Sequence, residues 1–262
     1  MIDSKARIAN ARLGGLRCME LYGNPGTTSG RSKGGKATVN LFQQNPALAK
    51  KLGFVLRKNI KIPNKSVELA EMVGAILGDG GLPGNHQLIL SFNKKTDQEY
   101  AQYLRALLKK LFALDSYIYY RKNNNGAEII VSSSNLVEFL EKLGFVKGNK
   151  VKNQVDVPGW INEKLEYRLA CLRGLMDTDG GLYSHCYNSN GKNYKYMKLS
   201  FSNCSRPLLD FVFNVLKSLN FKVYLNEVHV SIYAASDVKR YFAEVGSHNH
   251  KHIFKFKEHF DI

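Results

Sequence analysis

One stretch of the chain occurs twice, one hundred residues apart, and this duplication constrains the fold more than any other feature. The segment AEMVGAILGDGGL, residues 70–82, aligns without gaps with ACLRGLMDTDGGL, residues 170–182. The pattern around each copy also repeats, in the order helix, strands, helix, strands, helix. The sequence therefore predicts an internal duplication, with each copy forming one similar structural unit.

Shifts in composition place the boundaries of these units. We expect a basic N-terminal extension over residues 1–65, a first repeat over 66–147, a linker over 148–160 and a second repeat over 161–262. The expected fold class is α+β, with two pseudo-symmetric αββαββα repeats. The polar segments 23–38 and 184–195 are expected to be loops, and 248–252 a polar C-terminal segment.

Small residues recur at intervals of four in both copies of the duplicated helix. They are Ala70, Gly74 and Gly78 in the first copy and Ala170, Gly174 and Thr178 in the second. This spacing puts each set on one helical face, where small side chains let two backbones approach closely. We therefore expect the two helices to pack on each other as the seam between the repeats, with their C-terminal ends together.

The seam predicts a pair of neighbouring carboxylates, because Asp79 and Asp179 occupy equivalent positions at the two helix ends. Two such charges repel each other and also face the negative ends of the helix dipoles. A divalent cation removes this conflict, and carboxylate oxygens suit Mg²⁺. Asp177 aligns with Leu77 instead of with an acid, so we interpret Asp177 as a structural residue.

Charge indicates the partner of the chain. The net charge is +16 and the sequence pI is about 9.6, which is typical of proteins that bind a polyanion. Residues 1–65 carry 13 Lys and Arg residues against two acids, a net charge of +11. A metal held between carboxylates beside a polyanion is an arrangement that cleaves phosphodiesters.

Other features favour an intracellular protein that does not enter a membrane. The sequence has no run of about 18 apolar residues, as a membrane span requires, and its N-terminal segment lacks the apolar core of a secretory signal. Its four cysteines are widely spaced without a CxxC pair, which favours a reducing environment over a zinc or redox site.

The duplicated stretch also resembles a known signature. The segment L-R-G-L-M-D-T-D-G, residues 172–180, resembles the LAGLIDADG motif position by position, and A-I-L-G-D-G, residues 75–80, resembles its more degenerate form. The resemblance covers about residues 66–250 and is to single-chain, two-repeat LAGLIDADG homing endonucleases. It implies that the antiparallel β-sheets of the two repeats form a DNA-binding saddle that lies in the major groove. It also implies cleavage of both strands across the minor groove to leave short 3′ overhangs.

The resemblance also implies roles for individual residues. Asp79 and Asp179 would bind Mg²⁺ or Mn²⁺, with Ca²⁺ as a non-cleaving substitute, and the carbonyls of Gly78 and Thr178 would be additional ligands. A basic residue after the first strand pair assists catalysis in this family, and Lys95 fits that place, with Lys94 second. The matching stretch of the second repeat, residues 200–207, has no lysine. This leaves open unequal cleavage of the two strands, or cleavage of one strand only.

Alternation along the strands predicts which polar side chains face DNA. Those expected on the outer face are Gln87, Arg121, Lys198, Ser200, Lys222, Asn226, His229 and Ser231, and Lys94 and Lys195 lie in segments beside the strands.

The leading hypothesis is therefore a monomeric, intron-encoded endonuclease that cleaves a long, asymmetric site in double-stranded DNA. The alternatives within this fold are an RNA maturase, which assists intron splicing, and a DNA-binding protein that does not cleave. Both motif acids are present, which favours the nuclease.

The basic extension generates a prediction of its own. We expect residues 1–52 to contact DNA phosphates, which gives affinity that depends on salt and not on sequence. A chain that starts near Ser66 should bind DNA less tightly and show a shallower dependence of affinity on salt concentration. An unchanged salt slope in a titration of the two proteins would contradict this role.

Overall fold

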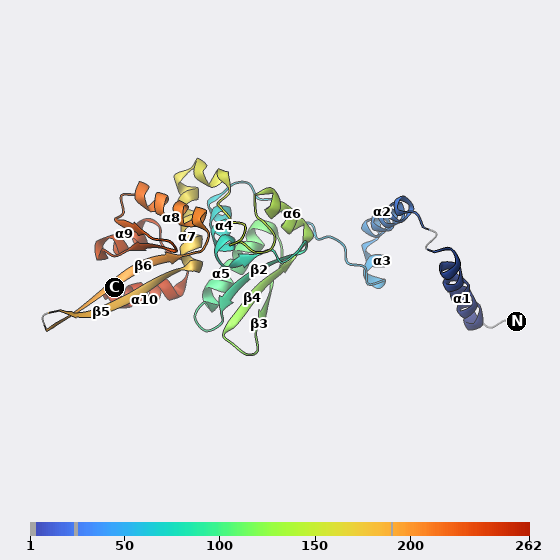
Figure 1. The fold of residues 1–262 in the computed structure, drawn as a ribbon, viewed down its shortest axis with the longest axis horizontal. Helices are drawn as coiled ribbons and strands as arrows, with labels where there is room; N and C mark the ends of the chain where they lie inside the picture. The colour runs from blue at the N-terminus through green and yellow to red at the C-terminus, as the bar shows by residue number, and fades with distance from the viewer. Residues whose placement is uncertain (1–3, 24–25, 190) are drawn as a thin grey trace. The chain divides into compact units, whose positions relative to one another are not determined.

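The structure is a computed structural model that describes residues 4–23, 26–189 and 191–262 (Figure 1). The chain divides into two compact units, Met1–Arg57 and Lys58–Ile262. The first unit consists of helices α1 (Ser4–Tyr22), α2 (Thr28–Gln44) and α3 (Pro46–Lys51). Its buried contacts are few: Phe42 packs on Phe54 with ring centroids 4.6 Å apart, and Ala49 lies beside α2.

The prediction of a loop over residues 23–38 is wrong from residue 28 onward, where the chain forms helix α2. Thr27 caps α2, and its hydroxyl oxygen accepts a hydrogen bond from the Gly30 amide at 3.0 Å. A capping threonine satisfies one of the free amides at a helix start. It stabilises the first turn of a helix in which the glycines that follow have low helix propensity.

The second unit contains both repeats. The first comprises α4 (Val67–Asp79), β1 (Gly80–Gly81), β2 (Gln87–Asn93), α5 (Gln98–Phe112), β3 (Tyr117–Tyr120), β4 (Gly126–Ser132) and α6 (Ser134–Lys142). A linker with the 3₁₀ turn η1 (Gly159–Glu163) leads to α7 (Leu165–Asp179), β5 (Gly180–Ser189), β6 (Lys192–Ser202), α8 (Arg206–Ser218), β7 (Val223–Leu225), β8 (His229–Ile232), α9 (Ala235–Glu244) and α10 (His250–Phe260).

The described strands form two antiparallel sheets with the same topology. Their orders are β1-β2-β4-β3 and β5-β6-β8-β7. One face of each sheet packs on its own helices, with Leu88 and Leu90 of β2 and Leu199 and Phe201 of β6 buried. The predicted α+β fold, with two repeats that each contain an antiparallel sheet, is confirmed.

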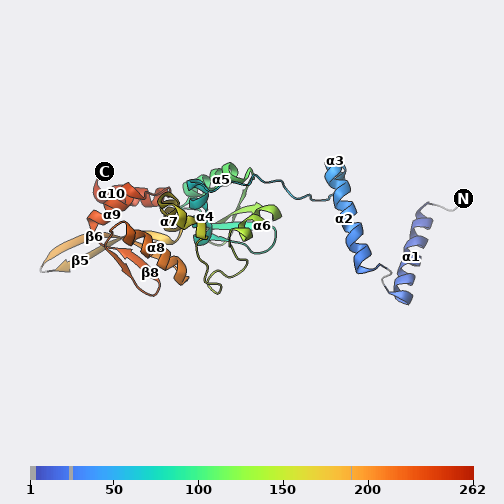
Figure 2. The ribbon, with the colours of Figure 1, turned by 90° about the horizontal axis from the view of Figure 1, so that it is seen from above.

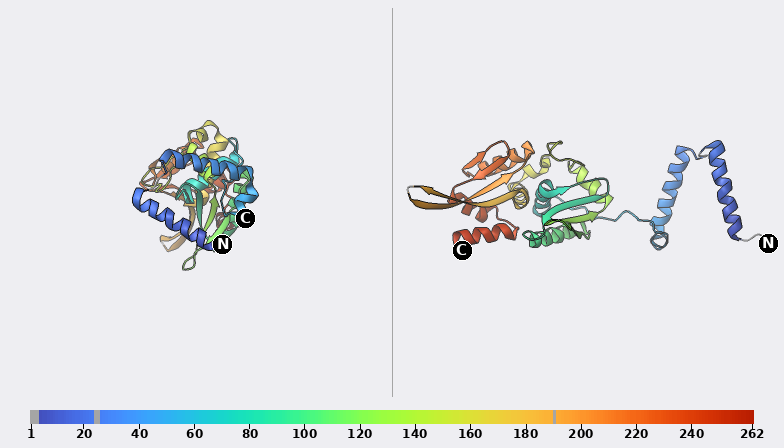
Figure 3. Two further views of the ribbon diagram at one scale, coloured as in Figure 1. Left: turned by 90° about the vertical axis from the view of Figure 1, so that its right-hand side faces the viewer. Right: turned by 60° about the horizontal axis from the view of Figure 1, so that its bottom comes forward.

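Helices α4 and α7 pack side by side at the centre of this unit (Figures 2 and 3). A Cβ atom on Gly74 would lie 2.2 Å from the carbonyl oxygen of Cys171, and one on Gly174 would lie 2.2 Å from that of Glu71. A Cβ on Gly78 would lie 2.0 Å from Thr178 Oγ1. The predicted seam is confirmed, because only glycine permits backbones this close.

The second repeat differs from the expectation in two places. The segment 184–195, expected to be a loop, continues the β5–β6 hairpin, because each strand supplies the hydrogen-bond partners of the other up to the pair Ser189 and Lys192. The segment 248–252 begins α10, which Asn249 caps by accepting a hydrogen bond from the Lys251 amide. Among the described residues α10 has no counterpart in the first repeat, where α6 continues into the linker.

Each helix in the described part of the chain is too short or too polar to cross a lipid bilayer.

The close contact at Gly74 predicts a large effect of one methyl group. Gly74→Ala should lower the free energy of unfolding by about 2–3 kcal/mol, since overpacking at a rigid backbone contact forces the helices apart. Urea denaturation measures this change. Gly84→Ala is the matched control, because a Cβ there meets nothing within 4 Å. Equal stabilities of the two variants would show that the seam tolerates a side chain.

Candidate active site

Asp79 and Asp179 are the last residues of α4 and α7, and both side chains are partly exposed. Burial and the negative charge of Asp179 together raise the pKa of Asp79 to about 7. Burial also raises the pKa of Asp179. The two carboxylates therefore lie at one site, where the charge of Asp179 opposes the ionisation of Asp79.

A lysine from the linker lies at the same site. The ammonium group of Lys150 donates hydrogen bonds to the carbonyl oxygens of Ile76 at 3.4 Å and Leu77 at 2.7 Å, and also to that of Gly78. It thus caps the negative end of α4. Burial lowers its pKa, and the charges of Asp179 and Asp79 act in the opposite direction.

A second lysine occupies the related position after the closing helix of the other repeat. Lys251 follows α9 as Lys150 follows α6, and its positive charge lowers the pKa of Asp79. Its ammonium group pairs with Asp97 Oδ1 at 2.8 Å.

Sequence reasoning missed both lysines. The signal was the register of the duplication, since Asn149 and Asn249 are one hundred residues apart and a lysine follows each within two positions.

The two halves of the site hold their aspartates differently. The Asn203 side-chain amide donates a hydrogen bond to Asp179 Oδ2 at 2.7 Å, in the stretch where the second repeat lacks a lysine. In the first repeat the carboxylate of Asp97 lies close enough to Asp79 to raise its pKa. The site is therefore pseudo-symmetric but not symmetric.

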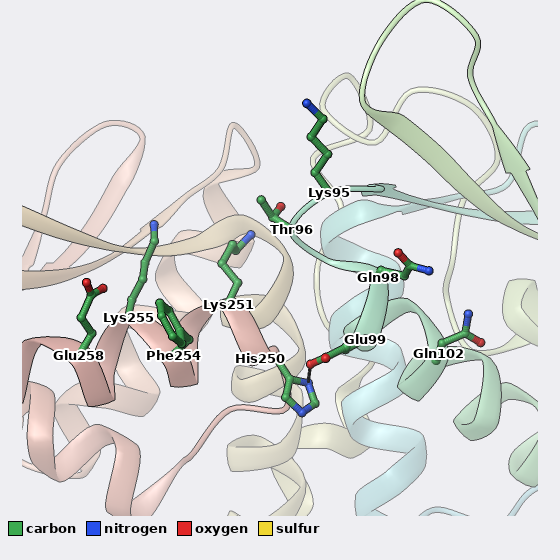
Figure 4. A pocket seen from close by; sticks show the side chains of 10 residues that line it. All are labelled: Lys95, Thr96, Gln98, Glu99, Gln102, His250, Lys251, Phe254, Lys255 and Glu258. Carbon is green, nitrogen blue, oxygen red and sulfur yellow. Dashed lines mark ion pairs between the residues drawn. The ribbon is translucent and has the colours of Figure 1, made fainter.

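The lysines proposed from sequence lie beside this centre. Lys94 donates to the carbonyl of Arg121 at 3.2 Å, which ties it to the β3–β4 hairpin. Lys95 stands in the turn between β2 and α5 with an exposed side chain (Figure 4). Lys150 and Lys251, and not Lys95, are the lysines whose charges act most on Asp79.

The donor set fits a hard divalent cation. Two aspartate carboxylates converge where two helix dipoles end, and burial raises the pKa of both, so a bound cation would stabilise their charged forms. Asp79 and Asp179 are the residues that would hold it. The expectation that the Gly78 carbonyl is an open ligand is not met, because Lys150 already donates to it. At Thr178 the hydroxyl is directed back into α7, donating to the carbonyls of Gly174 and Leu175 at 2.9 Å.

A buried polar network stands behind the aspartates. Glu71 and Asp177 are each 2% exposed, and with His248 they lie close enough to hold a metal ion. However, Arg173 donates twice to Glu71 Oε2, at 2.8 and 3.2 Å, and Tyr103 donates to its other oxygen. Asp177 accepts hydrogen bonds from the hydroxyl of Ser247 and the amide of His248, the latter at 2.8 Å. The network thus fastens the α9–α10 loop to the seam, which agrees with the structural role expected for Asp177.

The residues expected to face DNA fall into three groups. Those at least partly exposed are Gln87, Lys94, Arg121, Lys198, Lys222, Asn226 and His229. The backbone of Lys195 pairs in β6, but its side chain lies outside the described part of the structure. Ser231 is only 6% exposed and shares a hydrogen bond of 2.9 Å with Ser200, so the expectation that these two serines are open to DNA is wrong. They pair across adjacent strands and satisfy each other.

Several exposed residues of this set already have partners. Arg121 pairs with Glu128, and Asn226 Oδ1 accepts hydrogen bonds from the amides of Val228 and His229, which shapes the β7–β8 turn. His229 Nδ1 lies 2.7 Å from Ser202 Oγ. These contacts fix the side chains at the ends of the strands.

Comparison with known proteins gives matches in sequence and in fold. Residues 166–246 match the LAGLIDADG-like domain. A curated relative, the replication factor C small subunit of Methanocaldococcus jannaschii, is 27% identical over 73% of this chain, and the matched part is only 10% of that protein.

Among solved structures, I-SmaMI bound to an uncleaved DNA target with calcium ions is 12% identical, with a TM-score of 0.51 over 76% of this chain and 89% of that one. I-DmoI in complex with DNA and Mn is 20% identical, with a TM-score of 0.44 over 70% of this chain and 98% of that one. The likeness to I-SmaMI shows a shared fold.

The second repeat thus matches the LAGLIDADG-like domain over residues 166–246, and the repeated αββαββα architecture shares the fold of I-SmaMI.

Proposed function

We propose that the chain is a site-specific endonuclease that uses Mg²⁺ to hydrolyse both strands of double-stranded DNA. The observation that carries this proposal is the pairing of Asp79 and Asp179 at the ends of two closely packed helices. The charge of +16 supports a polyanionic substrate. The DNA target and calcium ions in the I-SmaMI structure support DNA and a divalent cation here.

The aspartates and the residues beside them have separate roles in the proposed reaction. Asp79 and Asp179 would hold the cation, whose chemistry there would be to activate water and stabilise the leaving 3′ oxygen. Asn203 holds one Asp179 oxygen by its hydrogen bond, so the carboxylate keeps a fixed direction. Lys150 lies in the same charged centre and stabilises the negative charge that develops on the phosphate. Manganese would replace magnesium, and calcium would bind without cleavage.

The sheets supply recognition in this proposal. Their outer faces carry Lys, Arg, Gln and His side chains at strand ends, types that contact bases and phosphates in the major groove. The seam between the repeats then lies across the minor groove, with the aspartates at the scissile phosphates. A single chain with two unequal repeats acts as a monomer on a long, asymmetric site.

The unequal halves of the site bear on the two cleavage steps. Lys251 is held by Asp97, whereas Lys150 contacts backbone carbonyls. Asn203 contacts Asp179, whereas Asp79 has Asp97 as a nearby acid. These differences favour unequal rates of cleavage of the two strands.

Removal of one carboxylate tests the proposed metal ligands. Asp179→Asn should lower cleavage by about 10³-fold or more, because metal catalysis supplies several kcal/mol of transition-state stabilisation. DNA binding should remain. Cleavage-site selection on a random duplex library with Mg²⁺ gives the target, and a gel assay then measures cleavage. Asp210→Asn, on the surface of α8, is the control and should stay active. Retained cleavage by Asp179→Asn would reject the proposed site, and an RNA-splicing activity in place of cleavage would favour the maturase.

Removal of the Lys150 charge tests the role of the linker lysine. Lys150→Met should reduce the cleavage rate by about 100-fold, since a positioned charge at a developing anion contributes about this much, while the affinity for DNA changes little. Lys152→Met removes an equal charge from an exposed site two residues away and should leave the rate unchanged. If both variants cleave at the rate of the parent chain, Lys150 has no catalytic role.

The pKa of Asp79 is about 7 in the folded chain and returns to the usual aspartate value, near 3.8, in the unfolded chain. Between about pH 4 and 7 the folded state binds the extra proton, so metal-free stability should fall as pH rises across this range. Ca²⁺ needs the ionised carboxylate, so it should raise the melting temperature much more at pH 8 than at pH 5.5. Asp79→Asn should remove this difference. An equal effect of Ca²⁺ at both pH values would contradict the assignment.

A further inference from the structure

A groove with a volume of about 810 Å³ lies between the N-terminal half of α5 and the added helix α10. The β2–α5 turn and α5 contribute one wall, and α10 contributes the other (Figure 4). The lining residues are Lys95, Thr96, Gln98, Glu99 and Gln102 on the first wall and His250, Lys251, Phe254, Lys255 and Glu258 on the second. The groove therefore joins the first repeat to a helix that the duplication does not explain.

The charges of this groove are arranged unevenly. The side chains of Lys95, Lys251 and Lys255 extend to the same side as the β3–β4 hairpin, whereas Glu99 pairs with His250 on the other side (Figure 4). The Glu99–His250 distance is 3.2 Å, so that acid has a local partner. The rim thus carries three ammonium groups, with Glu258 at its far end. Lys251 pairs with Asp97, and Lys255 makes one long hydrogen bond of 3.5 Å to the carbonyl of Leu182.

The floor between these lysines is apolar. Phe254 leaves 68% of its surface exposed between Lys251 and Lys255 on α10. An exposed aromatic ring flanked by lysines suits a ligand that combines phosphates with apolar edges, as the sugar–phosphate backbone does.

The groove is fixed relative to the catalytic aspartates. Lys251, on the α10 wall of the groove, pairs with Asp97 at 2.8 Å, and its positive charge lowers the pKa of Asp79. The loop before α10 is fastened to α7, because the Asn249 side chain donates to the carbonyl of Asp177 at 2.9 Å. His252, on the inner face of α10, is buried. A ligand at the seam would therefore reach this groove without any rearrangement of α10.

We propose that the α5–α10 groove is a contact surface for the phosphate backbone of duplex DNA, beside the catalytic aspartates and separate from the base-reading faces of the sheets. This inference rests on the proposed function, because it assigns the groove to the same DNA. Its chemistry is independent of base sequence, since the rim offers ammonium groups to phosphates.

The test compares two charge reversals on the same helix. Lys255→Glu changes the groove rim, and Lys257→Glu changes an exposed residue two positions on, which points to the opposite side of α10. Both variants change the net charge equally and both lie in the second half of the helix. The full-length proteins are titrated with a random-sequence DNA duplex of about 30 base pairs by fluorescence anisotropy over a salt series, and circular dichroism verifies folding. Phe254→Ala tests the floor separately.

Lys255→Glu should weaken binding by about tenfold and lower the slope of log affinity against log salt by about one, the value for one lost phosphate contact. Lys257→Glu should change affinity by less than about twofold. Phe254→Ala should weaken binding by a factor that does not depend on salt.

Equal effects of the two charge reversals would overturn the groove while the parent chain still binds and cleaves DNA, which leaves the proposed function standing. A parent chain that binds no duplex would overturn both proposals. A loss of affinity at Lys255→Glu for an RNA hairpin but not for the DNA duplex would also reject the groove as a DNA contact.

Discussion

The contact between α4 and α7 is the constraint on which the rest of the structure depends. Gly74 and Gly174 let the two backbones touch, and no other residue type fits where a Cβ would lie 2.2 Å from a carbonyl oxygen. Because the helices belong to equivalent places in two repeats, their contact sets the repeats about a common seam. It also brings the two C-terminal aspartates together, so the packing that holds the fold is the packing that creates the candidate active site.

This packing has an electrostatic cost that the surrounding chain offsets. Burial raises the pKa of both aspartates, and the charge of Asp179 also raises that of Asp79; Lys150 on the α4 carbonyls and Lys251 beside Asp97 supply positive charge nearby. Behind them the Glu71–Arg173 pair crosses from one repeat to the other, which joins the halves through buried charge. A divalent cation between the aspartates would neutralise their remaining negative charge. The two halves of the site differ, because Asn203 contacts Asp179 whereas Asp97 lies near Asp79.

Much of the fold of the second unit follows from pattern alone. Hydrophobic periodicity locates the helices and strands of both repeats, because each element buries one face against its own core. Where the sequence misleads, the missing information is a partner or a cap. The β5–β6 hairpin runs through a polar segment because each strand satisfies the other's backbone, and α10 forms in a histidine-rich segment because Asn249 caps it and the seam buries His252. Helix α2 likewise depends on the Thr27 cap, which the glycine-rich composition conceals.

For the candidate site, the sequence by itself predicted that Asp79 and Asp179 stand at equivalent helix ends and distinguished Asp179 from Asp177, because the duplication at a fixed offset compares each position with its own copy. It also determined the glycine seam, since helical spacing places small residues on one face. Only the tertiary structure decided which cations and amides surround the aspartates. Lys150, Lys251 and Asn203 come from a linker, a terminal helix and a strand end far apart in sequence. Asn203 contacts Asp179, Lys150 contacts the α4 carbonyls and Lys251 contacts Asp97, and these contacts form only after both repeats have packed. Linear spacing cannot encode such a meeting, because it depends on the paths of loops and not on the period of any one helix or strand.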